Sequence, residues 1–215
     1  MNVRELHWYD RLAVDMPEAK RGEWRVERFT ISEEEARFAS LRAAIGGTGE
    51  RIRAGNYTRL KRNHTLVMSD TPDEKSDHMS PLLEAERRPA PVTVLVGGLG
   101  LGMVTTGLLS YPQVTHVTVI EQSPDVLWLT GRHLQQRFGD RLHLIEADLL
   151  TWKPPKDVRW TLAWWDIWDA KCMDNLDQMA TLHRRFARRV EWQGSWSKEG
   201  LRYRRRQERR MGWRP

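Results

Sequence analysis

The sequence predicts an α/β fold, with a mostly parallel β-sheet, flanking helices and a small α+β lobe at the N-terminus. Three observations support this. From Val92 onward, short apolar strands alternate with helical segments, the pattern of a parallel sheet with right-handed crossovers. The first of these strands, Val92–Val96, is rich in β-branched residues, as expected for a strand buried on both faces. A glycine-rich turn follows it directly and leads into a helix.

The composition fits this class. A length of 215 residues allows one substantial α/β core and a small accessory lobe, but not two full domains. No stretch approaches the roughly 18 consecutive apolar residues of a membrane helix. The N-terminus lacks an uninterrupted apolar segment of the signal-peptide kind, and the single Cys172 suits a reducing compartment. We therefore expect a cytoplasmic protein.

Residues 1–70 are expected to form the small lobe. Trp24–Ile31 alternates polar and apolar residues in the manner of a half-buried strand. Ser32 and Glu35 have the S-x-x-E spacing of a capping box, which predicts a helix that ends at Gly46. Two further strands are expected at 51–57 and 64–68. The first twenty residues show no period and are expected to form an irregular arm.

A helix capped by Asp70 or Thr71, with Pro72 in its first turn, is expected to run to about Arg87 and to end at Pro89. It opens the main domain, which is expected at 71–197 and is followed by a basic tail at 198–215. The elements expected next are a strand at 92–96, a helix at 102–110, a strand at 116–120, a helix at 124–137, strands at 142–146 and 160–165, and a helix at 175–188.

The turn after the first core strand carries Gly98, Gly100 and Gly102 in a G-x-G-x-G frame. Glycine permits a tight turn and lets a ligand approach the backbone closely. Glu121 and Asp148 stand at the carboxyl ends of the next two strands, the edge at which open α/β sheets bind ligands. A carboxylate at 121 can accept both hydroxyls of a ribose, and one at 148 can receive the exocyclic amine of an adenine. We therefore predict a Rossmann-like nucleotide-binding unit; the alternative is a ligand-free fold whose glycines only permit close helix packing.

The G-x-G-x-G frame differs from the G-x-x-G ending of dinucleotide sites. It resembles the first motif of the class I S-adenosylmethionine-dependent methyltransferases, and Glu121 and Asp148 resemble the second and third landmarks of that superfamily. The resemblance implies S-adenosyl-L-methionine as the cofactor. The residues expected to bind it are Gly98, Gly100, Gly102, Glu121, Gln122, Asp148 and Leu149.

Four segments resemble the spermidine synthase branch of this superfamily in order and spacing: VTVLVGGLGLG, HVTVIEQSPDVL, LHLIEADLLTW and WTLAWWDIWDA. The resemblance covers roughly residues 50–196. Asp166 and Asp169 reproduce that group's D-x-x-D, which implies that Asp166 acts as a base toward an attacking amine and that Asp169 helps to hold the amine. The segment from Val190 to Trp196 looks like the family's fifth strand, which makes Gln193 a candidate substrate-binding residue. Capping the turn after the strand is the alternative role for Asp166.

Two departures from the family pattern change the expected chemistry. The family's glycine loop carries an aspartate that binds the amine of decarboxylated S-adenosylmethionine, and Gly100 stands at that position. Gly100 therefore favours unmodified S-adenosylmethionine as the donor, and methyl transfer over aminopropyl transfer as the reaction. The chain also ends soon after the expected fifth strand, so the usual last two strands are expected to be missing or replaced by a basic helix. The expected sheet is therefore C-terminally truncated.

Aromatic and histidine side chains accompany the two aspartates. Trp168 suits a cationic or planar acceptor through cation–π contact or stacking. Strand alternation sends Trp164 and Trp165 to opposite faces of the sheet, so at least one of them is expected in the core. His78 is a candidate substrate-binding residue that closes the site from the N-terminal side, although a lone histidine on a helix is more often structural. No histidine or cysteine spacing suggests a metal site.

The formal net charge is +6, and the excess lies mainly after residue 184. Such a segment can attract nucleic acid, or it can be a solvated terminal helix. Our leading hypothesis is an S-adenosylmethionine-dependent methyltransferase that acts on a small amine or on a planar or cationic acceptor. The alternatives are a polyamine aminopropyltransferase and a catalytically silent module that binds nucleic acid through its basic tail. A homodimer that covers an exposed sheet edge is possible, and no membrane partner is expected.

Overall fold

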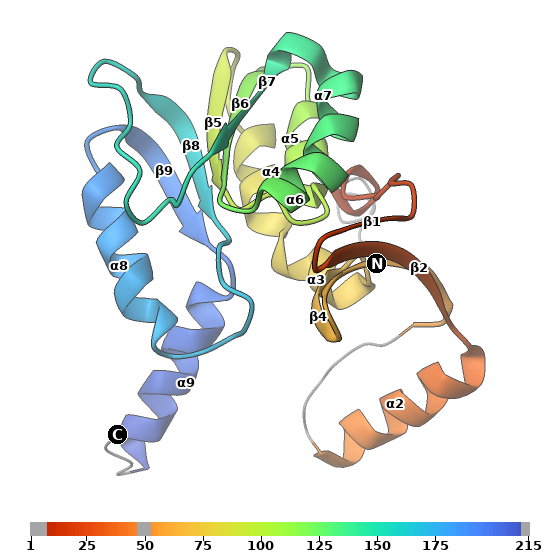
Figure 1. Cartoon of the computed structure of the whole chain (residues 1–215). Coiled ribbons are helices and arrows are strands. Elements are labelled where there is room, and N and C mark those ends of the chain that lie inside the picture. Colours follow the sequence, from red (N-terminus) through yellow and green to blue (C-terminus); the bar gives the residue numbers. More distant parts are fainter. Residues whose placement is uncertain (1–7, 47–52, 212–215) are drawn as a thin grey trace.

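The computed structural model describes residues 8–46 and 53–211 and contains two β-sheets (Figure 1). The larger sheet is parallel, with strand order β7-β6-β5-β8-β9. β5 comes first along the chain and lies at the centre of this sheet, and the strand order reverses between β5 and β8. This arrangement confirms the predicted Rossmann-like α/β fold. The strands are β5 (Val92–Gly97), β6 (Val114–Glu121), β7 (Leu142–Glu146), β8 (Trp160–Trp165) and β9 (Val190–Ser195).

Helices cover both faces of the larger sheet (Figure 1). On one face lie α4 (Met79–Glu86), α5 (Met103–Leu109) and α7 (Arg132–Phe138), and on the other lies α8 (Asn175–Phe186). Alternation along β8 divides its side chains between two apolar cores. Trp164 packs into the core under α4, α5 and α7, whereas Trp165 packs against Phe186 of α8. Both tryptophans are buried, which confirms that this pair fills the core.

Two of the predicted helices are interrupted. The segment expected to run from about 72 to 87 forms α3 (Pro72–Asp77) and α4, separated by His78, whose backbone leaves the helical region (φ −101°, ψ 8°). Pro81 explains the break, because it has no N–H to donate to the carbonyl of Asp77 and its ring clashes with that carbonyl in a continuous helix. The segment expected at 124–137 stays helical, as α6 (Pro124–Val126), a π-helical turn (Leu127–Gly131) and α7.

The smaller sheet is antiparallel, in the order β1-β2-β3-β4. Its strands are β1 (Ala19–Arg21), β2 (Trp24–Ile31), β3 (Gly55–Arg62) and β4 (Thr65–Ser69). β2 has the predicted bounds. Residues 1–7 of the expected irregular arm lie outside the described residues, and β1 corrects this expectation only at the end of the arm, where pairing with β2 orders the chain. β3 lies later than the strand expected at 51–57, because all eight residues of β2 pair with it, and residues 51 and 52 lie outside the described residues.

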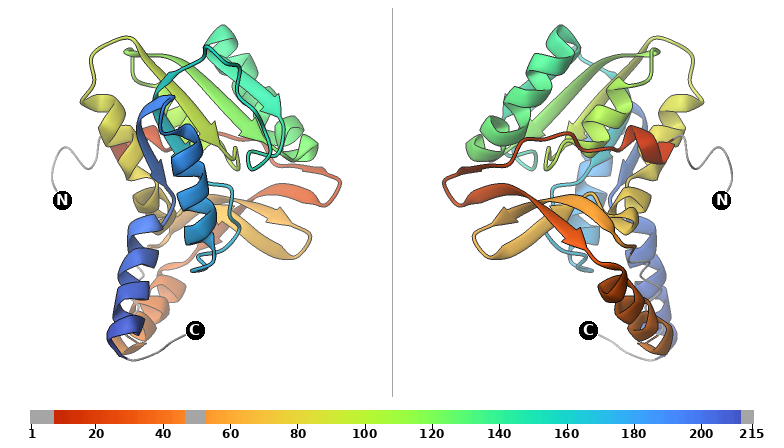
Figure 2. Two further views of the ribbon diagram at one scale, coloured as in Figure 1. Left: turned by 90° about the vertical axis from the view of Figure 1, so that its left-hand side faces the viewer. Right: turned by 90° about the vertical axis from the view of Figure 1, so that its right-hand side faces the viewer.

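Two helices extend away from the sheets (Figure 2). α2 (Glu33–Gly46) begins with the predicted capping box: Ser32 N donates to Glu35 Oε2 at 2.8 Å, and Glu35 N donates to Ser32 Oγ at 3.2 Å. Its apolar side chains Phe38 and Leu41 are each 57% exposed. α9 (Lys198–Arg210) follows β9 and places the predicted basic tail on a helix. No helix among the described residues has the length and apolar character needed to cross a membrane.

Candidate active site

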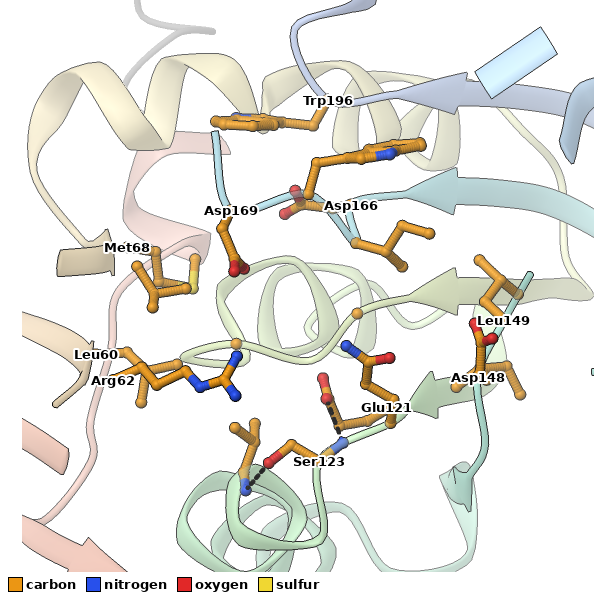
Figure 3. Close-up of a pocket in the computed structure, with 18 of the residues that line it drawn as sticks. Leu60, Arg62, Met68, Glu121, Ser123, Asp148, Leu149, Asp166, Asp169 and Trp196 are labelled. Atoms are coloured by element: carbon orange, nitrogen blue, oxygen red, sulfur yellow. Dashed lines mark hydrogen bonds between the residues drawn. The ribbon is translucent and has the colours of Figure 1, made fainter. Parts of the chain in front are cut away.

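A cavity lies between the carboxyl edge of the larger sheet and one face of the smaller sheet (Figure 3). The larger sheet contributes the loops that follow β5, β6, β7 and β8, and the smaller sheet contributes side chains of β2, β3 and β4. Of the site residues predicted from the sequence, all but two line this cavity. Those that do are His78, Gly98, Gly100, Glu121, Gln122, Asp148, Leu149, Asp166, Trp168 and Asp169.

The glycine loop after β5 turns tightly. Gly98, Gly100 and Gly102 have φ angles of 88°, 52° and 72°, in the left-handed region that favours glycine. A Cβ at Gly98 would stand 1.9 Å from the carbonyl oxygen of Asp166, so the loop packs directly on the loop after β8. Gly102 does not line the cavity. A Cβ there would meet Leu134 of α7 at 2.4 Å, so this glycine serves the packing of the helix rather than the approach of a ligand.

Glu121 ends β6 and is 9% exposed. Its Oε2 accepts the N–H of Leu99 at 2.9 Å, and its Oε1 accepts the N–H of Ser123 at 2.8 Å. Burial raises the pKa of this carboxyl group, and the backbone N–H donors oppose that shift. A carboxylate has four lone pairs, and the backbone donors do not use all of them, so Glu121 keeps acceptor capacity for a ligand hydroxyl. The carboxylate is thus held by the glycine loop and is still able to bind.

Asp148 and Leu149 follow β7 and form the rim of the cavity. Asp148 Oδ1 accepts the N–H of Leu150 at 2.8 Å, which fixes the carboxylate in the turn. Leu149 is buried against Gly97, where a Cβ would stand 2.3 Å from its Cδ2. Arg185 of α8 donates to the carbonyl oxygens of Leu149 and Leu150. No sequence pattern predicts this role for Arg185, which attaches the rim to the helix behind the sheet.

Asp166 follows β8, and its side chain is 21% exposed. Its Oδ2 lies 3.6 Å from Nε2 of His78, whose side chain is 1% exposed. Burial raises the pKa of Asp166 well above its usual range, and Glu74, Asp77 and other nearby carboxylates raise it further. Burial also lowers the pKa of His78 to about 4. Both shifts favour the neutral forms, an uncharged imidazole beside a protonated carboxyl group.

Aromatic rings and a second carboxylate complete this side of the cavity. Trp168 lines it and donates its Nε1–H to Oε1 of Gln178 at 2.6 Å. Trp196 is 8% exposed and lines it from the end of β9 (Figure 3). Asp169 is exposed and points into the same space. The rings and the two aspartates of the D-x-x-D therefore share one wall.

Gln193 does not reach the cavity. Its Oε1 accepts the Nε1–H of Trp165 at 3.1 Å, and its Nε2 donates to the carbonyl oxygen of His183 at 2.9 Å. Alternation along β9 directs it toward α8, and Trp196 at the end of that strand takes the place beside the cavity instead. A substrate-binding role for Gln193 is therefore not compatible with its position.

The sequence did not identify the wall formed by the smaller sheet. Met68 lies closest to the glycine loop: its Sδ accepts the N–H of Leu101 at 3.1 Å, and it would stand 2.2 Å from a Cβ at Gly100. Glu74, in the first turn of α3, also lines the cavity, and burial raises the pKa of its carboxyl group to about 7, helped by the nearby charge of Asp77. The remaining residues of this wall are Trp24, Leu60, Arg62 and Val67.

The cavity is acidic although the whole chain is basic. Its ionisable lining groups are mostly carboxylates, whereas the formal net charge of the protein is +6. The carboxylates are Glu74, Glu121, Asp148, Asp166 and Asp169. Carboxylates that face one another across a partly buried space favour a cation among them. The arrangement therefore favours ligands that carry positive charge.

No protein-family model and no curated protein matches the chain. Solved structures resemble part of it. They include the CcbJ methyltransferase from Streptomyces caelestis (18% identity, TM-score 0.43), the [4+2]-cyclase SpnF (17%, 0.42) and a putative sarcosine dimethylglycine methyltransferase from Galdieria sulphuraria (18%, 0.41). The matches cover 54%, 55% and 54% of this chain and 45%, 43% and 41% of those chains, respectively. Each match therefore spans less than half the length of the similar protein.

Proposed function

We propose that the protein is an S-adenosyl-L-methionine-dependent methyltransferase that acts on a small amine or on a planar, cationic acceptor. One observation supports this most strongly. The glycine loop and three carboxylates, Glu121, Asp148 and Asp166, come from four strands and meet at one acidic cavity. This cavity lies at the carboxyl edge of a parallel sheet, where α/β folds bind nucleotide-like ligands.

The residues present fit such a cofactor. Glu121 keeps acceptor capacity for the ribose, and Asp148 can accept a hydrogen bond from the exocyclic amine of adenine. Leu149 and Ile167 offer apolar surface beside the ring. When bound, the cofactor supplies a methyl group on a positively charged sulfur, which takes back the electron pair of the broken carbon–sulfur bond. The carboxylates of the cavity favour that positive charge.

Asp166 is the proposed base. In the ligand-free cavity its raised pKa favours the protonated form. A cation bound nearby lowers the pKa of a carboxyl group and so favours its ionised form. Asp166 then accepts the proton that the acceptor nitrogen loses, and Asp169, Trp168 and Trp196 surround the place where a cationic acceptor binds.

Aminopropyl transfer is the alternative reaction, since its donor is also a sulfonium and a polyamine also suits an acidic cavity. The contact between Met68 and the glycine loop favours methyl transfer. A thioether, rather than a carboxylate, occupies the space beside Gly100, so the loop offers no anionic partner there for the donor's amine. Calorimetry with S-adenosylmethionine, its decarboxylated form and S-adenosylhomocysteine tests this order. Preference for the decarboxylated donor would reverse it.

A second candidate function follows from α9. Its arginines are exposed, and four of them, Arg204, Arg206, Arg209 and Arg210, have no carboxylate partner among the described residues. This helix extends away from the sheets (Figure 2) and fits a silent module that binds nucleic acid. Binding of single-stranded RNA that weakens steeply with salt, and that is lost when these four become glutamine, would support this function if no donor binds.

A further inference from the structure

Arg62 stands out among the groups that line the cavity. Among the described residues, it is the positively charged side chain in a lining whose other ionised groups are carboxylates. It lies at the end of β3, where alternation places Leu60 and Arg62 on the same face as Trp24, which pairs with Arg62 on β2. This face of the smaller sheet forms the cavity wall, so Arg62 belongs to the wall through the register of the sheet.

The position of Arg62 along the cavity is specific. Figure 3 shows its guanidinium group directed into the cavity on the side of Glu121 that lies away from Asp148. With ribose at Glu121 and adenine at Asp148, as the proposed function has them, the amino-acid end of the donor extends toward Met68 and Arg62. The smaller sheet therefore faces that end of the ligand.

The side chain is held in place but keeps free donors. Arg62 Nε donates to Oε2 of Glu23 at 3.2 Å, and the guanidinium carbon lies 5.7 Å from the centre of the Trp24 ring. Its two terminal nitrogens carry four N–H groups with no partner among the described residues. The side chain is 53% exposed, which places these donors at the mouth of the cavity.

The chemistry of the proposed donor gives these N–H groups a partner. S-adenosylmethionine carries positive charge on its sulfur and amine, and one anionic group, its carboxylate. Among the described residues that line the cavity, the other ionised groups are carboxylates, so Arg62 is the group that attracts the donor's carboxylate. We propose that Arg62 binds the carboxylate of the donor and thereby selects S-adenosylmethionine over its decarboxylated form. The inference rests on the proposed function and names the residue that determines its donor specificity.

The test compares three ligands by calorimetry on the full chain: S-adenosylmethionine, decarboxylated S-adenosylmethionine and 5′-methylthioadenosine, which has no amino-acid end. For Arg62→Gln we expect the affinity for S-adenosylmethionine to fall about tenfold or more, as for the loss of a hydrogen bond between charged groups. The affinity for 5′-methylthioadenosine should stay unchanged, and that for the decarboxylated donor should stay unchanged or rise. Arg62→Lys should retain part of the preference.

Arg59→Gln is the matched control. Arg59 lies on the same strand, forms an ion pair with Glu27 at 2.7 Å and does not line the cavity. It should bind all three ligands as the unchanged protein does. If Arg62→Gln binds S-adenosylmethionine as tightly as the unchanged protein, or loses affinity for all three ligands equally, the inference is wrong. If the unchanged protein binds none of the three, the proposed function itself fails.

Discussion

The two walls of the cavity differ in chemistry. The wall from the larger sheet is backbone and carboxylate: a glycine loop, Glu121, Asp148 and Asp166. The wall from the smaller sheet is mostly apolar, and its polar features are the thioether of Met68, the guanidinium of Arg62 and, from the neighbouring α3, the carboxyl group of Glu74. The first wall has what any adenosyl sulfonium requires. In the proposed binding mode the second wall meets only the amino-acid end of such a ligand, which is the position from which one donor can be distinguished from another.

The largest expected effect lies in the larger-sheet wall. Asp166→Asn should lower turnover by about 10²- to 10⁴-fold, the usual contribution of a general base, while donor affinity changes little. Release of S-adenosylhomocysteine with a panel of small amines measures the first, and calorimetry measures the second. Asp157→Asn, an exposed carboxylate away from the cavity, is the control and should be neutral. Loss of donor binding in Asp166→Asn would mean that Asp166 holds the donor instead.

Glu121→Gln tests the same wall for binding rather than turnover. One oxygen of Glu121 would become an NH₂ group facing a backbone N–H donor, of Leu99 or of Ser123, so a hydrogen bond and a ribose acceptor are lost together. Affinity should fall about tenfold to a hundredfold for S-adenosylmethionine and 5′-methylthioadenosine alike. This uniform loss contrasts with the selective loss expected for Arg62→Gln. A loss confined to S-adenosylmethionine would contradict the assignment of Glu121 to the ribose.

Glu74 should make the stability of the protein depend on pH. Its pKa is raised to about 7, so folding favours its protonated form. The stability it contributes is complete below pH 4.5, its usual pKa, and is lost as the pH rises through 7. Glu74→Gln should therefore stabilise the protein by on the order of 2 kcal/mol above pH 7, with little change at pH 4. Urea unfolding at both pH values measures the change in the free energy of unfolding. An equal effect at both would show that folding does not raise the pKa of Glu74.

His78 should act in the opposite direction. Burial lowers its pKa to about 4, below its usual 6.5, so the stability it contributes is present above pH 6.5 and is lost as the pH falls through 4. The two groups therefore limit the stability of the protein at opposite ends of the pH range.

A cationic acceptor should bind more tightly as Glu74 ionises near pH 7. Comparing the affinity for this acceptor at pH 6 and pH 8, in the unchanged protein and in Glu74→Gln, isolates the contribution of Glu74.

The two walls also differ in how far the sequence predicts them. Glu121, Asp148 and Asp166 each end a strand of one parallel sheet, so strand prediction alone places them at a common edge. Arg62 and Met68 reach the cavity only because one sheet packs against another. The sequence shows which residues of β3 and β4 share a face with Arg62 and Met68. It does not show which surface that face packs against, because this depends on contacts between residues more than thirty positions apart, such as Met68 and Leu101.

Within the predicted elements, the errors have local causes. The break at His78 could have been predicted from Pro81. In an uninterrupted helix Pro81 would have to donate an N–H to the carbonyl of Asp77, four residues earlier, and proline has no N–H. Gln193 was assigned by resemblance, and alternation along β9 would have placed it on the face toward α8. The exposure of Phe38 and Leu41 on α2 could not be predicted from the sequence, because helical spacing indicates an apolar face but not what covers that face.

The smallest expected effect tests the contact between the two walls. Gly100→Asp places a Cβ 2.2 Å from Met68 Sδ at a φ of 52°, so it should destabilise the protein by about 1–2 kcal/mol. Met68→Ala removes the clash but not the backbone cost, so Gly100→Asp should cost less in the Met68→Ala protein, with a coupling of about 1 kcal/mol. The double variant should also gain affinity for decarboxylated S-adenosylmethionine, since the carboxylate of the new aspartate then stands beside the donor's amine. Thermal unfolding and calorimetry measure the two effects. Additive destabilisation would show that Met68 and Gly100 do not share this space, and an unchanged donor preference would place donor selection in the smaller-sheet wall alone.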